Sequence, residues 1–98
     1  MEDSMSVFTV RVEMQNADRD DYDTLHKKMA AKGYSREVTA SSGTTYQLPD
    51  AEYTYTNSTK NEAQVADEVK AIADSVKNYS RVLVTKSAGR AIRGLKIV

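Results

Sequence analysis

The sequence predicts one small α+β domain in which strands and helices alternate in the order strand, helix, strand, strand, helix, strand. Three observations support this prediction: an alternating apolar strand at 6–14, two amphipathic helices near 20–32 and 59–77, and a hairpin between them. This order is that of the ferredoxin-like split βαβ fold, a four-stranded antiparallel sheet with both helices on one face. Right-handed crossovers would arrange its strands as fourth, first, third, second.

The first strand and the first helix have clear sequence signals. Within 6–14 every second residue is apolar, as in a strand that is covered on one side: Phe8, Val10, Val12 and Met14. Asp18 or Asp20 can cap the next helix, and Gly33 stands where a left-handed C-cap is expected. The helix between them carries one apolar stripe, made of Tyr22, Leu25 and Met29.

The central hairpin is expected to pair 34–40 with 51–56. The second of these segments alternates and is rich in aromatic and β-branched residues, which is typical of a half-buried strand. Gly43 permits a turn between the arms, and Pro49 stops any structure that precedes the second arm. The hairpin is therefore predicted to lie at the centre of the chain.

The second half of the chain repeats the pattern of helix and strand. Thr59 and Glu62 have the spacing of a capping box, after which Val65, Val69, Ile72 and Val76 form an apolar helical stripe. The segment 81–86 is predicted to be the fourth strand. The remainder, 87–98, is a basic C-terminal extension of the single domain 1–98, and 95–98 is either a tail or a short fifth strand.

Composition excludes several classes of protein. The 98 residues suffice for one domain, and the absence of cysteine excludes a disulfide framework, a thiolate zinc site and a cysteine nucleophile. No apolar run approaches the roughly 20 residues that span a bilayer, and the acidic start is unlike a signal peptide. A cytoplasmic protein without membrane contact is therefore expected. No cofactor is expected either. The 14 basic and 14 acidic residues cancel, so nucleic acid would have to bind through local asymmetry of charge.

Two features could carry proton or metal chemistry. His26 is the only histidine, and it can act as a general acid or base, although a packed boundary residue is the favoured interpretation. Acidic residues gather at and beyond the end of the first strand, where a carboxylate pair can hold a divalent metal: Glu13, Asp18, Asp20, Asp21 and Asp23. Roles as helix cap and dipole partner are favoured for Asp20 and Asp21, so no metal site is predicted.

Two further features bear on nucleic acid. Arg11 could line a phosphate-binding surface together with the basic C-terminal residues, which are Lys86, Arg90, Arg93 and Lys96, but a solvated tail is favoured. Tyr53 and Tyr55 could stack on bases, but a place in the core is favoured for both.

Short matches around the hairpin resemble the GhoS family of type V toxin–antitoxin antitoxins. They lie within a stretch from about Phe8 to Val84, and the matching residues are Gly33-Tyr34-Ser35, Val38, Gly43, Gln47-Leu48, Thr54 and Thr56. The resemblance implies a ferredoxin-like fold and sequence-selective cleavage of the messenger RNA of a small membrane toxin.

The resemblance also implies that a basic residue in the middle of the first helix takes part in cleavage. That position falls on His26, where the family has arginine. The function expected is thus that of a GhoS-like antitoxin, an endoribonuclease with His26 as the catalytic residue. Single-stranded RNA would be bound by Arg11, Lys27, Lys28, Arg90 and Arg93. The alternative is a non-catalytic ferredoxin-like interaction module that forms a homodimer through its sheet edge, using the fourth strand and 95–98.

Overall fold

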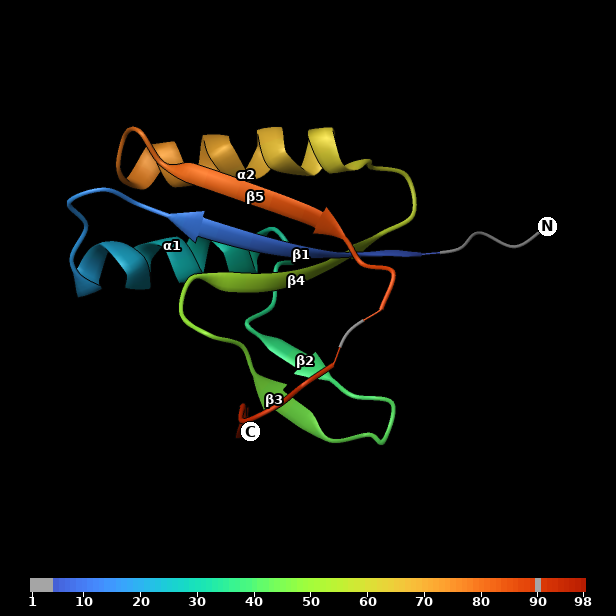
Figure 1. Cartoon of the computed structure of the whole chain (residues 1–98). Helices are drawn as coiled ribbons and strands as arrows, with labels where there is room; N and C mark the ends of the chain where they lie inside the picture. Colours follow the sequence, from blue (N-terminus) through green and yellow to red (C-terminus); the bar gives the residue numbers. More distant parts are fainter. Residues whose placement is uncertain (1–4, 90) are drawn as a thin grey trace.

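The computed structural model describes residues 5–89 and 91–98 and shows a small α+β protein with two helices and two three-stranded antiparallel sheets (Figure 1). In chain order the elements are β1 (Ser6–Glu13), α1 (Arg19–Ala31), β2 (Glu37–Thr39), β3 (Thr45–Gln47), β4 (Glu52–Asn57), α2 (Glu62–Val76), β5 (Arg81–Lys86) and β6 (Lys96–Ile97). The predicted α+β class is therefore confirmed, and the sheet arrangement is described next.

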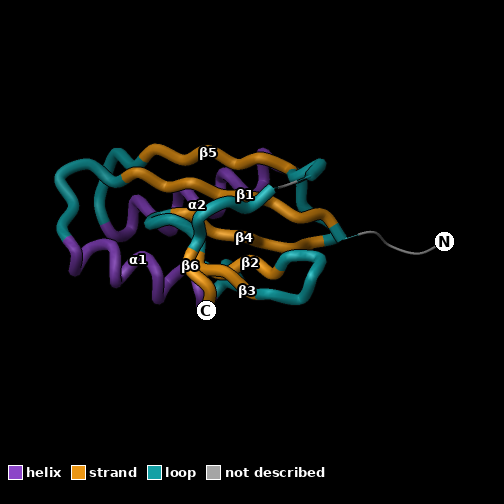
Figure 2. Tube along the Cα trace, turned by 60° about the horizontal axis from the view of Figure 1, so that its bottom comes forward, coloured by secondary structure: helices purple, strands orange, loops and turns teal. Residues whose placement is uncertain are grey.

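The first sheet has the order β4-β1-β5, with β1 at its centre. Val10 lies opposite Tyr53 on one side and Val84 on the other. Figure 2 shows α1 and α2 on the same face of this sheet. The alternating apolar residues of β1 point to that face, because period-two alternation puts them all on one side. They pack there against the buried residues of the helices, which are Leu25, Met29, Val65, Val69 and Ala73.

The second sheet has the order β2-β3-β6 and departs from the predicted hairpin. The segment 34–40 pairs with 45–47 and not with 51–56, apart from one isolated bridge between Ser35 and Thr54. The reason is a tight turn at Gly43, which has a φ of +93° and donates its N–H to the carbonyl of Ala40 at 2.9 Å. The chain therefore turns back after β2, before it reaches Pro49. The segment 34–40, which was predicted to be a strand of the first sheet, pairs with that sheet only at Ser35.

Of the two alternatives for 95–98, a tail or a short fifth strand, the strand is present as β6. Ile97 lies opposite Tyr46, and the Val98 N–H donates to the carbonyl of Thr45 at 3.0 Å. This part of the chain thus pairs with a sheet edge of its own molecule. Among residues 5–89 and 91–98, no helix is long and apolar enough to cross a membrane.

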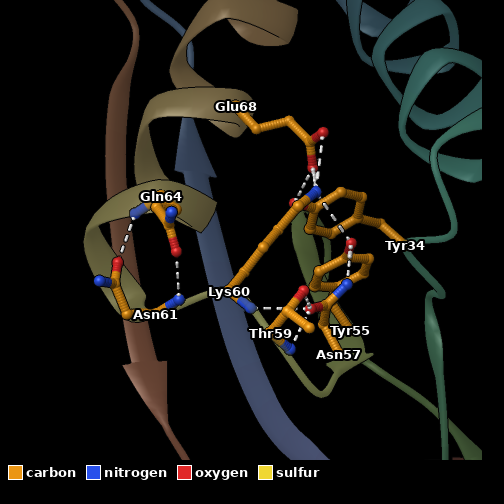
Figure 3. A network of polar contacts seen from close by, with 8 residues as sticks. All are labelled: Tyr34, Tyr55, Asn57, Thr59, Lys60, Asn61, Gln64 and Glu68. Atoms are coloured by element: carbon orange, nitrogen blue, oxygen red, sulfur yellow. Dashed lines mark hydrogen bonds and ion pairs between the residues drawn. The ribbon is translucent and has the colours of Figure 1, made fainter.

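The caps of the two helices differ in how well the sequence predicted them. Asp18 caps α1 and exchanges hydrogen bonds with Asp21, while Gly33 follows the helix with a φ of +91°, so both predictions are confirmed. The predicted capping box of Thr59 and Glu62 is wrong. Instead, Asn61 caps α2 and exchanges hydrogen bonds of 2.8 Å with Gln64 (Figure 3). The Thr59 N–H donates to Oδ1 of Asn57 at 2.8 Å, and this hydrogen bond closes a turn before the helix begins.

A polar network holds the chain before β2 against β4 and α2 (Figure 3). The rings of Tyr34 and Tyr55 stack with their centroids 4.1 Å apart. Glu68 accepts hydrogen bonds from the Tyr34 hydroxyl at 2.6 Å and from Lys60 Nζ at 3.1 Å, and Lys60 also donates to the Tyr55 hydroxyl at 3.1 Å. Burial works to raise the pKa of Glu68, but the hydrogen bonds from Tyr34 and Lys60 lower it overall. Tyr55 is therefore a core residue, as favoured.

The first prediction tests the shared core. Val69 is fully buried on α2, so Val69→Asp places an unpaired charge there, costing roughly 4 kcal/mol or more, which is most of the stability of a small domain. The variant should be unfolded by circular dichroism at 25 °C. Ala71→Asp is the matched control, because Ala71 is exposed on the same helix, and it should remain folded. A folded Val69→Asp protein with an unchanged melting temperature would disprove this core.

Candidate functional site

A cleft of about 850 Å³ lies at the end of the first sheet, where β1 ends and β4 and β5 begin. β1, β5, α1 and the connections that precede β2 and β4 contribute to its walls. Its charged residues are Arg11, Glu13, Arg19, Asp23, Arg36, Asp50 and Arg81. His26 and Tyr22 complete the polar lining. It is the cleft around which the candidate site is built.

One face of α1 supplies the largest group of these side chains. Arg19, Tyr22, Asp23 and His26 are separated by three or four residues, and this spacing brings side chains together on a helix. The face lies next to the buried stripe of α1, so packing of that stripe on the sheet turns the polar face toward the sheet end. The Tyr22 hydroxyl is held by the Met14 N–H at 3.0 Å.

His26 is fixed by a residue of the core. Its Nδ1 atom lies 2.6 Å from the hydroxyl of Tyr53, and the two rings have centroids 5.7 Å apart. Tyr53 is fully buried, so the base-stacking interpretation of this tyrosine is wrong. Burial raises the pKa of Tyr53, so its hydroxyl remains protonated and needs a hydrogen-bond partner inside the protein. His26 supplies that partner.

The surroundings of His26 favour its neutral form. Burial and then the positive charge of Arg36 lower the pKa of the ring, while Asp23 and Asp50 act in the opposite direction and do not outweigh them. The imidazole is therefore largely uncharged at pH 7, and its Nε2 atom can accept a proton when Nδ1 carries the ring proton and donates it to the Tyr53 hydroxyl. Because Nδ1 is engaged by Tyr53, Nε2 is the ring nitrogen left for another group.

Two arginines of the cleft form ion pairs that are exposed to solvent. Arg81 lies 3.0 Å from Glu13 and Arg11 lies 4.0 Å from Glu52, with both arginine side chains about seven-tenths exposed. Such exposed pairs contribute about 0–1 kcal/mol each and can exchange their partners. The lining holds four arginines against three carboxylates, which leaves one positive charge in excess. Glu52, which pairs with Arg11 from outside the lining, offsets this excess, so the cleft gathers arginines without a large net charge.

The structure brings together only part of the predicted RNA-binding set. His26 and Arg11 line the same cleft, whereas Lys27 is exposed outside its lining. Lys28 turns toward α2, where its Nζ atom donates to Ser75 at 3.0 Å. Arg93 donates to the neighbouring carbonyl of Ile92 and is not among the lining residues. Arg90 lies outside the described residues.

The acidic cluster is dispersed among separate roles. Asp18 caps α1 with Asp21 as its capping-box partner, while Asp20 lies in the first turn of the helix. Glu13 pairs with Arg81 across the sheet. Asp23 alone faces the cleft from α1. Within the part of the chain that the structure describes, no three His, Cys, Asp or Glu side chains are grouped so that they could hold a metal ion.

Sequence reasoning missed Arg19, Arg36, Arg81 and Asp50. Helical spacing from His26 would have found Arg19, since the two lie seven residues apart on one face. Arg81 enters the cleft because it lies opposite Glu13 in the register of β1 and β5. Arg36 precedes β2 in the chain and Asp50 follows β3. The two side chains meet only because β2 pairs with β3, which the sequence did not predict.

Comparison of the chain with family models, with curated proteins and with solved structures gave no match. The functional argument therefore depends on the chemistry of the cleft.

The second prediction concerns pH. The pKa of His26 is lower in the folded protein than its ordinary value of 6.5, so the unfolded chain binds more protons near that pH. Stability should be fully present above pH 6.5 and fall as the solution is acidified from there toward the lowered pKa. Urea unfolding between pH 7.5 and 5.5 should show this loss in the wild type. His26→Gln, which lacks the only histidine, should show none, and an equal loss in both proteins would contradict the assignment.

Proposed function

We propose that this protein is a GhoS-like antitoxin of the cytoplasm, which binds single-stranded RNA in the cleft at the end of the first sheet and cleaves it there. One observation supports the proposal above all. A histidine that favours its neutral form is fixed by a buried tyrosine in a cleft lined by four arginines. Proton transfer and binding of phosphate are the two capabilities that RNA cleavage requires.

The proposal includes a ferredoxin-like origin for the fold. It is supported by the order β4-β1-β5 with both helices on one face. The bridge between Ser35 and Thr54 adds support, because it holds the chain before β2 beside β4, where a split βαβ fold places its second strand. On this view the second sheet is an addition formed when β2 and β3 fold away from β4.

The chemistry proposed needs side chains of this chain and water. The ribose 2′-oxygen forms a bond to the adjacent phosphorus as the bond from phosphorus to the 5′-oxygen breaks, which leaves a 2′,3′-cyclic phosphate. The Nε2 atom of His26, with the ring proton on Nδ1, accepts the proton of the 2′-hydroxyl, and water supplies the proton that the departing 5′-oxygen takes up. Arginines at the cleft stabilise the charge that develops on the phosphate. Arg11 and Arg81 are the accessible candidates for this role, since both are exposed at the end of the sheet.

Self-association through the sheet edge is a second candidate function. β5 pairs with β1 on one side and, among the described residues, with no strand on the other. Leu83 on this strand is 61% exposed. An unpaired edge with an exposed leucine can pair with a second copy of the chain.

The third prediction separates the two candidates. A mixed pool of single-stranded RNA is incubated with wild type, His26→Gln, Arg81→Gln and Lys27→Gln, each with and without chelator. His26→Gln should cleave at least 100-fold more slowly, because general acid–base catalysis contributes about that factor or more. Arg81→Gln should reduce the slope of log affinity against log salt by about 0.7, the value for one phosphate contact on a single strand.

Lys27→Gln is the matched control, because Lys27 lies on α1 but outside the cleft lining, and it should behave as wild type. Chelator should leave cleavage unchanged. If the wild type neither cleaves RNA nor binds it in a salt-dependent manner, the RNA proposal is excluded. A dimer in sedimentation under the same conditions would then support the interaction module.

A further inference from the structure

Arg36 has an unusual environment for a cleft arginine. It lies just before β2, where its carbonyl accepts the Leu48 N–H at 2.7 Å, so its backbone is held firmly. Its Nε atom is shut off from solvent and has no hydrogen-bond partner among the described residues. Its Nη2 atom makes one contact, of 3.4 Å, with the carboxylate of Asp50, whose side chain is fully exposed. The side chain is thus well anchored but poorly paired.

This single contact with Asp50 uses few of the N–H donors of the Arg36 guanidinium. Arginine presents five N–H donors in a planar fork, which matches the geometry of two phosphate oxygens. A single long contact to an exposed carboxylate satisfies little of this capacity, and exposed ion pairs of this kind are weak. A phosphate group carries more oxygens and can carry more charge than a carboxylate, so it is the better partner for the same guanidinium.

Arg36 is better suited than Arg81 to bind a phosphate group. Arg81 and Glu13 are opposite each other in the register of β1 and β5 and lie 3.0 Å apart, so the sheet keeps Glu13 beside Arg81 as a competing partner. Asp50 instead belongs to the turn between Pro49 and Ala51, and Ala51 has a φ of +61°. No strand pairing holds the Asp50 side chain in place.

We propose that Arg36 is a phosphate-binding subsite of the cleft, in which a phosphate oxyanion displaces the Asp50 carboxylate from the guanidinium. The inference rests on the proposed function, since it names the group by which the cleft would hold RNA. Arg36 and His26 line the same cleft, and the charge of Arg36 contributes to lowering the pKa of His26. A phosphate on Arg36 is therefore held beside the ring that is proposed to transfer the proton.

The fourth prediction tests this exchange of partners. The charged and titratable groups that act on His26 are Arg36, Asp23 and Asp50, with Tyr22 and Tyr53 against the ring. The NMR signals of the His26 ring are followed while inorganic phosphate is added, with chloride at equal ionic strength as the reference. A dinucleoside monophosphate in a parallel titration distinguishes a diester of RNA from free phosphate as the ligand.

Asp50→Asn should bind phosphate several-fold more tightly than wild type, because the competing carboxylate has been removed. Arg36→Gln should bind at least tenfold more weakly than wild type. Arg93→Gln is the matched control, because this arginine is exposed and is not among the cleft-lining residues, and it should behave as wild type. Asp50 is fully exposed, so Asp50→Asn should fold even if Arg36→Gln does not.

Phosphate binding that is no tighter in Asp50→Asn than in wild type would overturn the inference. Failure of the subsite and failure of the proposed function can be told apart. Phosphate binding with the expected order of variants but without RNA cleavage would retain the subsite and exclude the nuclease. RNA cleavage that is unchanged in folded Arg36→Gln would retain the nuclease and exclude the subsite.

Discussion

The structure depends on one buried hydroxyl. Tyr53 lies at the centre of the core, where its ring is fully enclosed, but its hydroxyl cannot be left without a partner because an unsatisfied buried polar group is costly, at roughly 1–3 kcal/mol. The hydroxyl meets Nδ1 of His26 at 2.6 Å. This contact fixes the position of α1 relative to β4 and at the same time orients the ring of the only histidine at the wall of the cleft. Core packing and the candidate site are thereby joined in one interaction.

The remaining features hold the two partners of this contact in place. Asp18 and Gly33 delimit α1, and Leu25 and Met29 fix its rotation on the sheet, so His26 faces the end of the sheet. On the other side, Tyr53 is positioned by its place opposite Val10. The network of Lys60 and Glu68 acts farther along β4, where it clamps the stacked tyrosines Tyr34 and Tyr55 and so holds the chain that leads to Arg36. Residues of β4 thus contribute both to the stability of the core and to the geometry of the cleft.

The sequence predicted those features that depend on local patterns. Alternation in β1, the Asp18 cap and the apolar stripes of both helices all reflect residues close together in the chain. The pairing of β2 with β3 was missed because it is decided by competition between two possible partners, and the turn at Gly43 favours the nearer one. For the same reason the sequence identified His26 and Arg11 but missed Arg36 and Asp50. Those two side chains are 14 positions apart and meet only once that pairing is known.

The most direct test of this account is the tautomer of the His26 ring, measured by nitrogen-15 NMR above its pKa in wild type and in Tyr53→Phe. This substitution removes only the hydroxyl and keeps the ring in the core. If the contact with Tyr53 orients the histidine, the wild type should show one dominant tautomer, with the ring proton on Nδ1 where Nδ1 donates to the hydroxyl and on Nε2 where Nδ1 accepts from it. Tyr53→Phe should show both tautomers in exchange. The same distribution in the two proteins would contradict the claim that this hydroxyl organises the site.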